Sequence, residues 1–503
     1  MRLYIPVERP RHALVIYLLS LVPFVVLALH QWDYLPRLTD GDFAQYILHA
    51  KAIVEGRRYT DTGYIFTPLT FLIGPKAQPP GLPLLLAPFV AIFGTNLIAL
   101  KSVVVLSAIA FVLIAANYFG RRESLWTGAA VALLTSLSLQ TQYATISVIA
   151  DLPFAAACWW LISLADREGA WTGYRAAVVT ILGGVAVAFR VAGAAAGLAV
   201  LLFALLRPHA QKRAASLPLV LWSLGGLVVV VLFGEFIPFA RQVLLLPEAD
   251  FFNRVADFAL HAKEAVLYAM LYPFGGDRPN DIYHLLCLVP MTIGGVHFLV
   301  RYRRTFAWCF TLSYMLMLSL APVQEARYIW PLYPVLAYAL VDGLEILVRW
   351  LRFLPGVATR APAVAFGTFA LLAVMSTWHA FRLPAPPSLL GNPDVQSLFA
   401  WLDTEKQHTP QRVVFINPRV LALETGIPAM APIFAREQRV LAEFNKHGIT
   451  AVIVGDVGTG EVADSVMRKV IADAPDRFTP VYRNPTFEVY RYAVRAVDRP
   501  NAK

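Results

Sequence analysis

The sequence is poor in charged residues and in cysteine. Only 15% of its 503 residues are charged, 58% are hydrophobic, and the mean hydropathy is +0.58. Soluble domains carry about 25% charged residues, so this composition excludes an ordinary soluble globular protein and predicts that lipid surrounds most of the chain. The three cysteines, at positions 158, 287 and 309, lie inside apolar runs without paired spacing. This pattern excludes a disulfide framework and a cysteine metal knuckle.

Motifs for metal, nucleotide and nucleic-acid binding are also missing. The histidines are scattered with no HExxH pattern, and GDVGTGEV at 455–462 lacks the lysine and the spacing of a phosphate cradle. The net charge of +10 comes from short Arg and Lys clusters between apolar runs. Such clusters are typical of loops that obey the positive-inside rule, and we therefore expect no nucleic-acid partner.

Apolar runs long enough to cross a bilayer fill most of the first 383 residues. They predict a polytopic α-helical membrane protein with about eleven spans, near 12–30, 98–119, 125–142, 152–165, 176–189, 191–206, 216–234, 283–300, 306–321, 329–348 and 362–381. A basic start precedes the first run, which is also the pattern of a signal peptide. Because no small-residue cleavage site follows, an uncleaved first span is favoured.

The run 82–94 decides the predicted sidedness. It is too short to cross and predicts an interfacial or re-entrant helix. If it does not cross, the basic clusters at 121–122, 207–213, 301–304 and 349–352 all face the cytoplasm. The other side then receives residues 31–97, 143–151, 235–282, 322–328 and the tail. We therefore expect a multi-pass protein of the cell inner (plasma) membrane whose polar chemistry is extracytoplasmic.

The tail changes character after a Pro-rich stretch that begins at Pro384. VVFIN at 413–417 and TAVIVGD at 450–456 predict strands, with helices between them, and 480–492 predicts a hairpin that turns at Asn484-Pro485. The sequence therefore predicts two domains. Residues 1–383 form the transmembrane domain, including the first outer loop 31–97, and residues 384–503 form a small soluble, extracytoplasmic α/β domain.

Three carboxylates lie where predicted spans meet the outer side. Asp40 and Asp42 follow the first span and precede a helical pattern, and Asp151 stands before Leu152-Pro153 at the fourth. A charge at a span boundary is costly unless it is paired or wet, which makes each acid a candidate functional group. The alternative for each is an ordinary helix N-cap. The Asp40 and Asp42 pair also offers hard oxygen ligands for a divalent ion.

Two arginines are candidates for binding an anion on the same side. Arg327 begins RYIWPLYP, and Arg190 lies between two apolar runs. Guanidinium groups bind phosphate oxygens well. The alternative for Arg327 is an interfacial anchor beside the belt residues Tyr328 and Trp330, and Arg190 fits a helix-boundary anchor equally well.

The stretch 40–94, with its DGDFAQY, VEG, QPPGLPLLLAP and FG elements, resembles GT-C membrane glycosyltransferases of the protein O-mannosyltransferase and aminoarabinose-transferase type, glycosyltransferase family 39. In that family a catalytic acid stands four residues before a Tyr. The resemblance places this acid at Asp42, before Tyr46, with Asp40 as the near alternative. A second acid falls on Asp151, and the R-Y-x-x-P-x-Y-P element falls on 327–334.

The sequence departs from the family pattern at two positions. Phe43 follows Asp42 where members often have Glu, and Gln78 precedes the two prolines where some relatives have a phosphate-binding Lys. Lys76 is the substitute that the sequence offers. The resemblance implies catalytic Asp42, Asp40 and Asp151, donor phosphate on Arg327, Arg190 and Lys76, and substrate contacts from Tyr46, Gln78 and Tyr328.

The resemblance implies inverting transfer of a sugar from a polyprenyl-phosphate donor to a protein, lipid or glycan acceptor outside the cytoplasm. It implies no metal and no cofactor. Two other classes of function fit a polytopic chain. A transporter or flippase is disfavoured because we find no internal repeat and few ionisable residues within spans. A non-catalytic assembly or sensor protein would not need an acid in the first loop.

Overall fold

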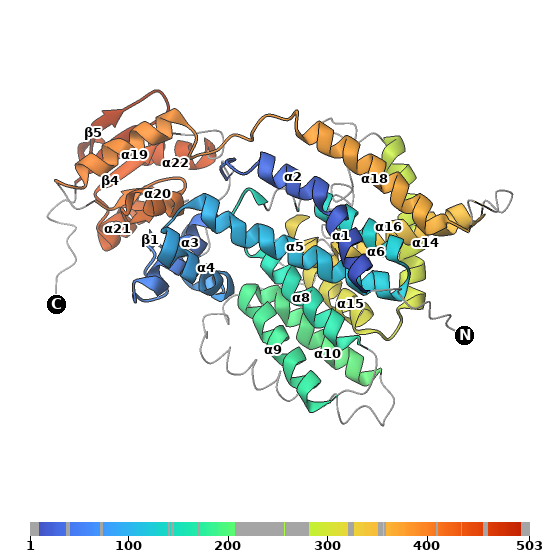
Figure 1. Cartoon of the computed structure of the whole chain (residues 1–503). Coiled ribbons are helices and arrows are strands. Elements are labelled where there is room, and N and C mark those ends of the chain that lie inside the picture. Colours follow the sequence, from blue (N-terminus) through green and yellow to red (C-terminus); the bar gives the residue numbers. More distant parts are fainter. Residues whose placement is uncertain are drawn as a thin grey trace. The chain divides into compact units, whose positions relative to one another are not determined.

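The computed structural model describes residues 10–36, 41–70, 74–138, 141, 145–167, 172–206, 256, 281–319, 326–350, 356, 359–408, 411–433, 435–455 and 461–493 (Figure 1). The chain divides into two compact units. The first, here called the helical unit, comprises 1–32, 101–146 and 150–384. The second, the sheet unit, comprises 33–100, 147–149 and 385–503.

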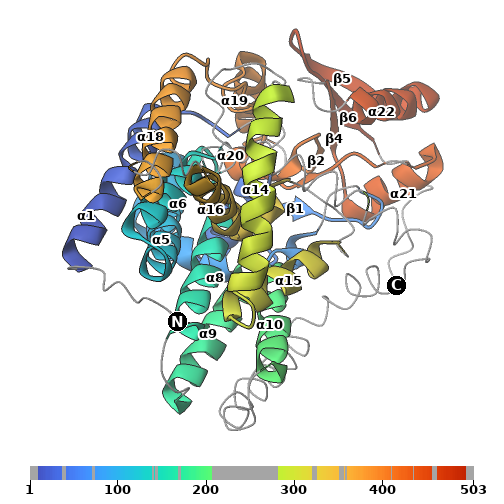
Figure 2. The same ribbon diagram turned by 90° about the vertical axis from the view of Figure 1, so that its right-hand side faces the viewer.

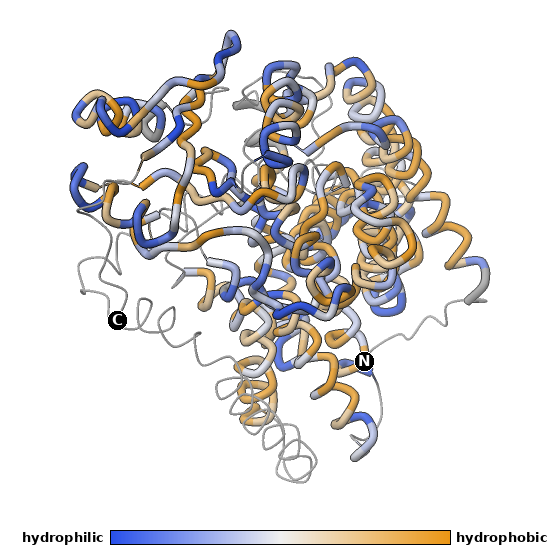
Figure 3. Tube along the Cα trace, turned by 90° about the vertical axis from the view of Figure 1, so that its left-hand side faces the viewer, coloured by the Kyte–Doolittle hydropathy of each residue, from blue (hydrophilic) through white to orange (hydrophobic). Residues whose placement is uncertain are grey.

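The helical unit consists of apolar helices, and hydrophobic residues dominate its helical segments in Figure 3. Its elements are α1 Pro10–Ser20, α2 Val22–His30, α5 Leu97–Arg122 from residue 101 onward, α6 Leu125–Leu137, α8 Asp151–Ala165, α9 Gly173–Phe189, η2 Val191–Gly193, α10 Ala194–Leu205, α14 Asp281–Arg301, α15 Phe306–Ser319, η3 Ala326–Leu332, α16 Tyr333–Trp350 and α18 Ala361–Ala380. Large apolar side chains such as Leu19, Ile181 and Leu371 are exposed, as expected of surfaces that contact lipid.

Among the described residues, four helices are long and apolar enough to cross a membrane: His12–His30, Leu97–Arg122, Arg327–Trp350 and Ala361–Ala380. Other expected spans coincide with shorter apolar helices, and the run 82–94 coincides with α4 Gly81–Phe93. The expected span 216–234 and the basic cluster 207–213 lie outside the described residues. So does the expected outer segment 235–282, apart from residues 256, 281 and 282. The count of about eleven spans therefore stays a prediction.

The helices α14 and α16 approach each other through glycine. A Cβ on Gly294 of α14 would overlap the carbonyl oxygen of Ala339, and a Cβ on Gly343 of α16 would overlap that of Pro290. Small residues allow two helix backbones to come this close, which is how helices associate where lipid removes the hydrophobic drive between them.

The sheet unit is built on a six-stranded mixed sheet in the order β1-β3-β2-β4-β6-β5. Its strands are β1 Tyr64–Ile65, β2 Val413–Val414, β3 Ala429–Met430, β4 Ala451–Val454, β5 Phe478–Arg483 and β6 Glu488–Tyr492. Strands β1, β3, β2 and β4 pair in parallel. Strands β4, β6 and β5 pair antiparallel and are labelled next to one another in Figure 2. Helical elements of this unit are α3 Asp42–Val54, η1 Pro75–Ala77, α4, α19 Pro393–Glu405, α20 Pro418–Thr425, α21 Glu437–His447, α22 Glu461–Asp473 and η4 Pro475–Arg477.

The strands expected in the tail are present, and the hairpin turns at the expected position. The side-chain oxygen of Asn484 accepts hydrogen bonds from the backbone of Thr486 at 3.1 Å and of Phe487 at 2.6 Å, which closes the turn between β5 and β6. The sequence did not predict β1. This strand comes from the first outer loop and pairs with β3, with Tyr64 opposite Ala429. The compact unit therefore groups 33–100 with 385–503, whereas the sequence grouped 31–97 with 1–383.

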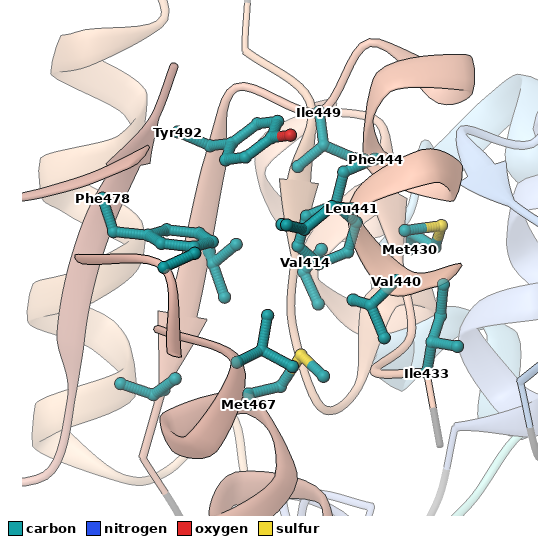
Figure 4. Close-up of a cluster of buried hydrophobic side chains, with 14 residues drawn as sticks. Val414, Met430, Ile433, Val440, Leu441, Phe444, Ile449, Met467, Phe478 and Tyr492 are labelled. Atoms are coloured by element: carbon teal, nitrogen blue, oxygen red, sulfur yellow. The ribbon is translucent and has the colours of Figure 1, made fainter. Parts of the chain in front are cut away.

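Hydrophobic side chains from α21, α22 and the strands form the core of the sheet unit (Figure 4). Val440 and Phe444 lie one helical turn apart on α21 and are fully buried. They pack in one cluster with Met467 of α22 and Tyr492 of β6. Ile65 of β1 packs against the same cluster, so the first outer loop contributes to this core.

Candidate active site

Asp42 is the first residue of α3. Gly41 holds the N-cap position, so Asp42 lies in the first turn and is not the N-cap that the alternative interpretation required. A carboxylate there is stabilised by the free amide groups and the dipole of the helix. The neighbouring candidate Asp40 lies outside the described residues.

Arg419 forms an ion pair with Asp42. Its Nη1 lies 2.8 Å from Asp42 Oδ1. The Arg419 side chain is 3% exposed and that of Asp42 is 29% exposed. The guanidinium carbon of Arg419 also lies 5.3 Å from the centre of the Tyr64 ring, within the range of a cation–π contact. The site therefore pairs a carboxylate of the segment 33–100 with a guanidinium of the tail.

The backbone brings α3 and α20 together at this point. A Cβ on Gly41 would lie 2.9 Å from the side-chain oxygen of Asn417, the N-cap residue of α20. Gly63 has a φ of +75°, and its carbonyl accepts a hydrogen bond of 2.9 Å from the amide of Ala429 at the start of β3. Glycine supports this positive φ without strain. Both glycines therefore permit the loop to pack closely against the tail.

Arg419 has no feature in the sequence that predicts a functional role. It is 377 residues from Asp42 along the chain and lies in an ordinary amphipathic segment, PRVLALET. No local motif marks such a residue. Only the pairing of the first loop with the tail reveals the ion pair.

Buried polar groups of α3 and the following loop form a hydrogen-bonded chain. His49 is fully buried, and burial lowers its pKa from 6.5 to about 4, which keeps the ring neutral. Its Nδ1 donates to the carbonyl of Tyr59 at 2.6 Å, so its Nε2 accepts from the Gln45 amide at 2.9 Å. The Tyr59 hydroxyl donates to the carbonyl of Gln78 at 2.9 Å.

Two of the predicted substrate contacts, Tyr46 and Gln78, are buried in the same part of the sheet unit. Tyr46 is buried on α3, one turn after Asp42, and Gln78 is buried where η1 ends. Lys76, two residues before Gln78, is exposed on η1. Among the three residues predicted to bind the donor phosphate, Lys76 is thus the one that lies on the surface of the sheet unit.

The helical unit holds the other predicted residues in one cluster. Asp151 is the first residue of α8, after an N-cap at Ala150, and its Oδ1 lies 2.5 Å from Arg190 Nη1. Asp151 is therefore not the N-cap of its helix. Arg190 caps the C-terminal end of α9 in extended conformation. An acid and a guanidinium that the sequence placed 39 residues apart form an ion pair.

Arg190 and Arg327 both lie over the ring of Tyr328. The guanidinium carbon of Arg190 is 4.6 Å from the ring centre and that of Arg327 is 5.6 Å from it. The structure thus brings two guanidinium groups to one aromatic ring, and the Asp151 carboxylate to one of them. Such an arrangement suits an anion such as phosphate.

Buried hydrogen bonds hold the segment that carries Arg327. The hydroxyl of Tyr314 donates to the carbonyl of Tyr328 at 2.7 Å, and Trp159 Nε1 donates to the carbonyl of Pro331 at 2.7 Å. Tyr314 and Trp159 are both fully buried. The 3-10 helix η3 is therefore fixed to α15 and α8, and its guanidinium is carried on a rigid support.

No group of three or more His, Cys, Asp or Glu side chains suited to a metal ion is found within the part of the chain that the structure describes.

Comparison with known proteins finds similarity in structure alone. No protein-family model matches the sequence, and no curated protein matches it. ArnT from Cupriavidus metallidurans bound to undecaprenyl phosphate is similar with a TM-score of 0.54 at 16% identity, over 96% of this chain and 98% of that chain. Its apo structure gives a TM-score of 0.52 at 15% identity, over 94% and 97%.

An archaeal protein is similar over the whole chain as well. The oligosaccharyltransferase AglB from Archaeoglobus fulgidus, in complex with an inhibitory peptide and a dolichol-phosphate, has a TM-score of 0.58 at 14% identity. The match covers 98% of this chain and 75% of that chain. Identities this low establish the fold and nothing finer. The chain therefore has the helical GT-C fold of membrane glycosyltransferases.

Proposed function

We propose that the chain is an inverting glycosyltransferase that moves a sugar from a polyprenyl-phosphate donor to an acceptor on the non-cytoplasmic side of the membrane. The fold supports this, since similar structures hold undecaprenyl phosphate and dolichol-phosphate. The observation that carries the proposal is the ion-paired carboxylate of Asp42, partly exposed at the first turn of α3. A transferase needs such a group, and a sensor or an assembly protein does not.

The carboxylate of Asp42 is the proposed general base. It accepts the proton of an acceptor hydroxyl while the hydroxyl oxygen attacks the anomeric carbon from the face opposite the phosphate. A new glycosidic bond forms, the bond from the anomeric carbon to the phosphate oxygen breaks, and its electron pair leaves with the polyprenyl phosphate. Configuration at the anomeric carbon inverts. Asp40 stays the alternative base.

The guanidinium groups of Arg327 and Arg190 are the proposed ligands of the donor phosphate. Negative charge grows on this phosphate as it leaves, and fixed cations stabilise that charge without reorganisation. Asp151 orients Arg190 through their ion pair at 2.5 Å.

Further contacts complete the proposed binding site. Lys76, exposed on η1, is a third ligand for the phosphate, and Tyr46, Gln78 and Tyr328 contact the substrates. The isoprenoid tail of the donor stays in the lipid beside the helices. We place the enzyme in the cell inner (plasma) membrane with residues 384–503 outside the cytoplasm, where the acceptor is a protein, a lipid or a glycan. The reaction needs no metal or other cofactor.

Substitution of the proposed base tests the function. Purified enzyme in lipid is supplied with labelled polyprenyl-phosphate sugars and an envelope extract as acceptor. We expect D42N to lower kcat by about 10²–10⁴-fold, since that is the usual contribution of a general base, with donor binding unchanged. The matched control is D61N, which removes an exposed acid of the same loop that pairs with Arg57 at 3.3 Å, and it retains wild-type transfer.

Two results would contradict the proposal. Full transfer by D42N removes Asp42 as the base. Movement of the labelled donor across the bilayer by the wild type, without transfer to any acceptor, would favour the transporter or flippase alternative.

A further inference from the structure

We infer that Arg419 is a positioning residue for the proposed base: it orients the Asp42 carboxylate and holds it ionised, so that the tail of the chain takes part in the transfer step. This inference rests on the proposed function. It assigns a reaction role to a residue 377 positions from the acid it serves.

The surroundings of Arg419 restrict the direction in which its side chain points. The residue lies in the first turn of α20, and its side chain is 3% exposed. Tyr64 of β1 flanks the guanidinium carbon at 5.3 Å. A buried side chain between a helix and an aromatic ring has few other rotamers open to it. The Nη1 atom, 2.8 Å from Asp42 Oδ1, therefore restrains where that carboxylate points.

The difference in exposure separates the roles of the two partners. Arg419 is enclosed, whereas Asp42 is 29% exposed and can meet a hydroxyl that arrives from outside the sheet unit. A pair that served only to fasten α20 to α3 would gain nothing from keeping its acid accessible. Arg419 thus supplies a buried positive charge, and Asp42 exposes its carboxylate to the acceptor hydroxyl.

The charge of Arg419 favours the ionised form of its partner. A carboxylate beside a guanidinium protonates at lower pH than one without it, because protonation breaks the ion pair. A general base works only when ionised. In the pH profile of kcat, the rate falls on the acid side as the base becomes protonated. Removal of the guanidinium is therefore expected to move this acid limb to higher pH.

Other titratable groups face Arg419 from the elements packed around it. The positive charge of Arg419 acts on His49 of α3 and on Tyr64 of β1, in each case toward a lower pKa. Within the same helix as Arg419, Glu424 interacts with Asp403 of α19. Burial lowers the pKa of His49 to about 4 and raises the pKa of Tyr64 and of Glu424. R419M removes this charge from His49 and Tyr64 as well as from Asp42. The same comparison in an H49Q background therefore separates the titration of His49 from that of the pair of Arg419 and Asp42.

The test compares R419M and R419K with the wild type in the full-length enzyme, with labelled polyprenyl-phosphate sugar as donor. Without the charge, R419M should lose about 10-fold to 100-fold in kcat, keep the donor KM within about twofold, and show an acid limb about one pH unit higher. R419K keeps the charge but not the planar fork of donors. It should retain the wild-type acid limb with an intermediate kcat.

The control is R491M, because Arg491 forms an ion pair of 2.6 Å with Glu405 but is 55% exposed. It should leave the rate and its pH profile unchanged. The inference is overturned if R419M keeps the wild-type kcat and profile, or if R419M and R419K lose equal activity with no shift of the acid limb. If R419M does not fold, R419K decides: a lowered kcat at unchanged KM supports the role, and a wild-type kcat overturns it.

The two proposals fail in different ways. Absence of transfer by the wild type to any acceptor overturns the proposed function, whatever Arg419 does. Transfer by D42N at the wild-type rate leaves the function standing but removes Asp42 as the base, and the role of Arg419 with it. Loss of transfer in D42N together with wild-type behaviour of R419M overturns the role of Arg419 alone.

Discussion

At the scale of single residues, burial decides which polar groups carry charge. The His49 ring is enclosed in the sheet unit between Gln45 and the Tyr59 carbonyl, and it stacks on the Tyr59 ring at 4.0 Å. Desolvation penalises its imidazolium form. In contrast, Asp42 and Asp151 each have a guanidinium within hydrogen-bonding distance. The two carboxylates are each paired with a cation, whereas burial keeps the imidazole neutral.

The neutral state of His49 predicts a pH dependence of stability. Burial lowers its pKa to about 4, whereas in the unfolded chain the pKa is 6.5. Between these values the unfolded state binds a proton that the folded state does not, so the stabilisation is complete above pH 6.5 and is lost as the pH falls toward 4. The loss is at most about 3 kcal/mol.

The variant H49Q lacks this titration. Chemical unfolding of the purified protein, repeated across this pH window, should show a shallower fall of the unfolding free energy than in the wild type. The control H408Q, at an exposed histidine, should keep the wild-type slope. Equal slopes for H49Q and the wild type would contradict the account.

At the scale of elements, close packing depends on glycine at defined positions. The helix α14 carries two adjacent glycines with opposite surroundings. A Cβ on Gly294 would overlap the Ala339 carbonyl of α16, whereas a Cβ on Gly295 would meet nothing within 4 Å. One glycine is required by the partner helix, and the other is not.

This contrast makes a matched pair of substitutions. We expect G294A to destabilise the protein by about 1–3 kcal/mol, because the added methyl group forces α14 and α16 apart. G295A adds the same methyl group in open space and should be neutral, or stabilising by up to about 1 kcal/mol through helix propensity. Thermal unfolding in detergent measures both. Similar melting temperatures for the two variants would refute the close contact.

The elements also show what the sequence could predict. Runs such as 98–119 and 362–381 are confirmed as the helices α5 and α18, because a long apolar run has few other outcomes in lipid. The strand β1 has two residues, too few for any periodicity, and its existence depends on β3 at the other end of the chain. Pairing across such a separation leaves no local pattern.

In the candidate site, too, residues with a local sequence pattern were predictable and a residue without one was not. Asp151, Arg190, Arg327 and Tyr328 were identified from span boundaries and a short motif, and the structure brings them to one cluster. Asp42 was identified in the same way. Its partner Arg419 was not, since a buried arginine on a short helix has no signature until the elements around it are placed.

At the scale of the whole molecule, sidedness connects the sequence to the proposed reaction. Basic clusters were assigned to the cytoplasm and the acids of the first loop to the other side. Introduced single cysteines can show on which side of the membrane a residue lies. Cys287 is first replaced, because it is partly exposed and would itself react, whereas Cys158 and Cys309 are buried. Suitable exposed positions are Ala400 in the sheet unit and Arg303 after α14.

We expect a membrane-impermeant maleimide to label A400C in cells whose plasma membrane is intact. It should label R303C only after permeabilisation. Each variant is the control for the other, since both are exposed and differ in predicted side alone. The opposite pattern would place the proposed base in the cytoplasm and exclude a donor that is used outside.

The proposed reaction depends on where the phosphate of the donor binds. An experimental structure of the enzyme with polyprenyl phosphate bound tests this most directly. We expect the phosphate to lie on the guanidinium groups of Arg327 and Arg190. A phosphate bound elsewhere, or an Asp42 carboxylate on the opposite face of the membrane, would contradict the proposed reaction.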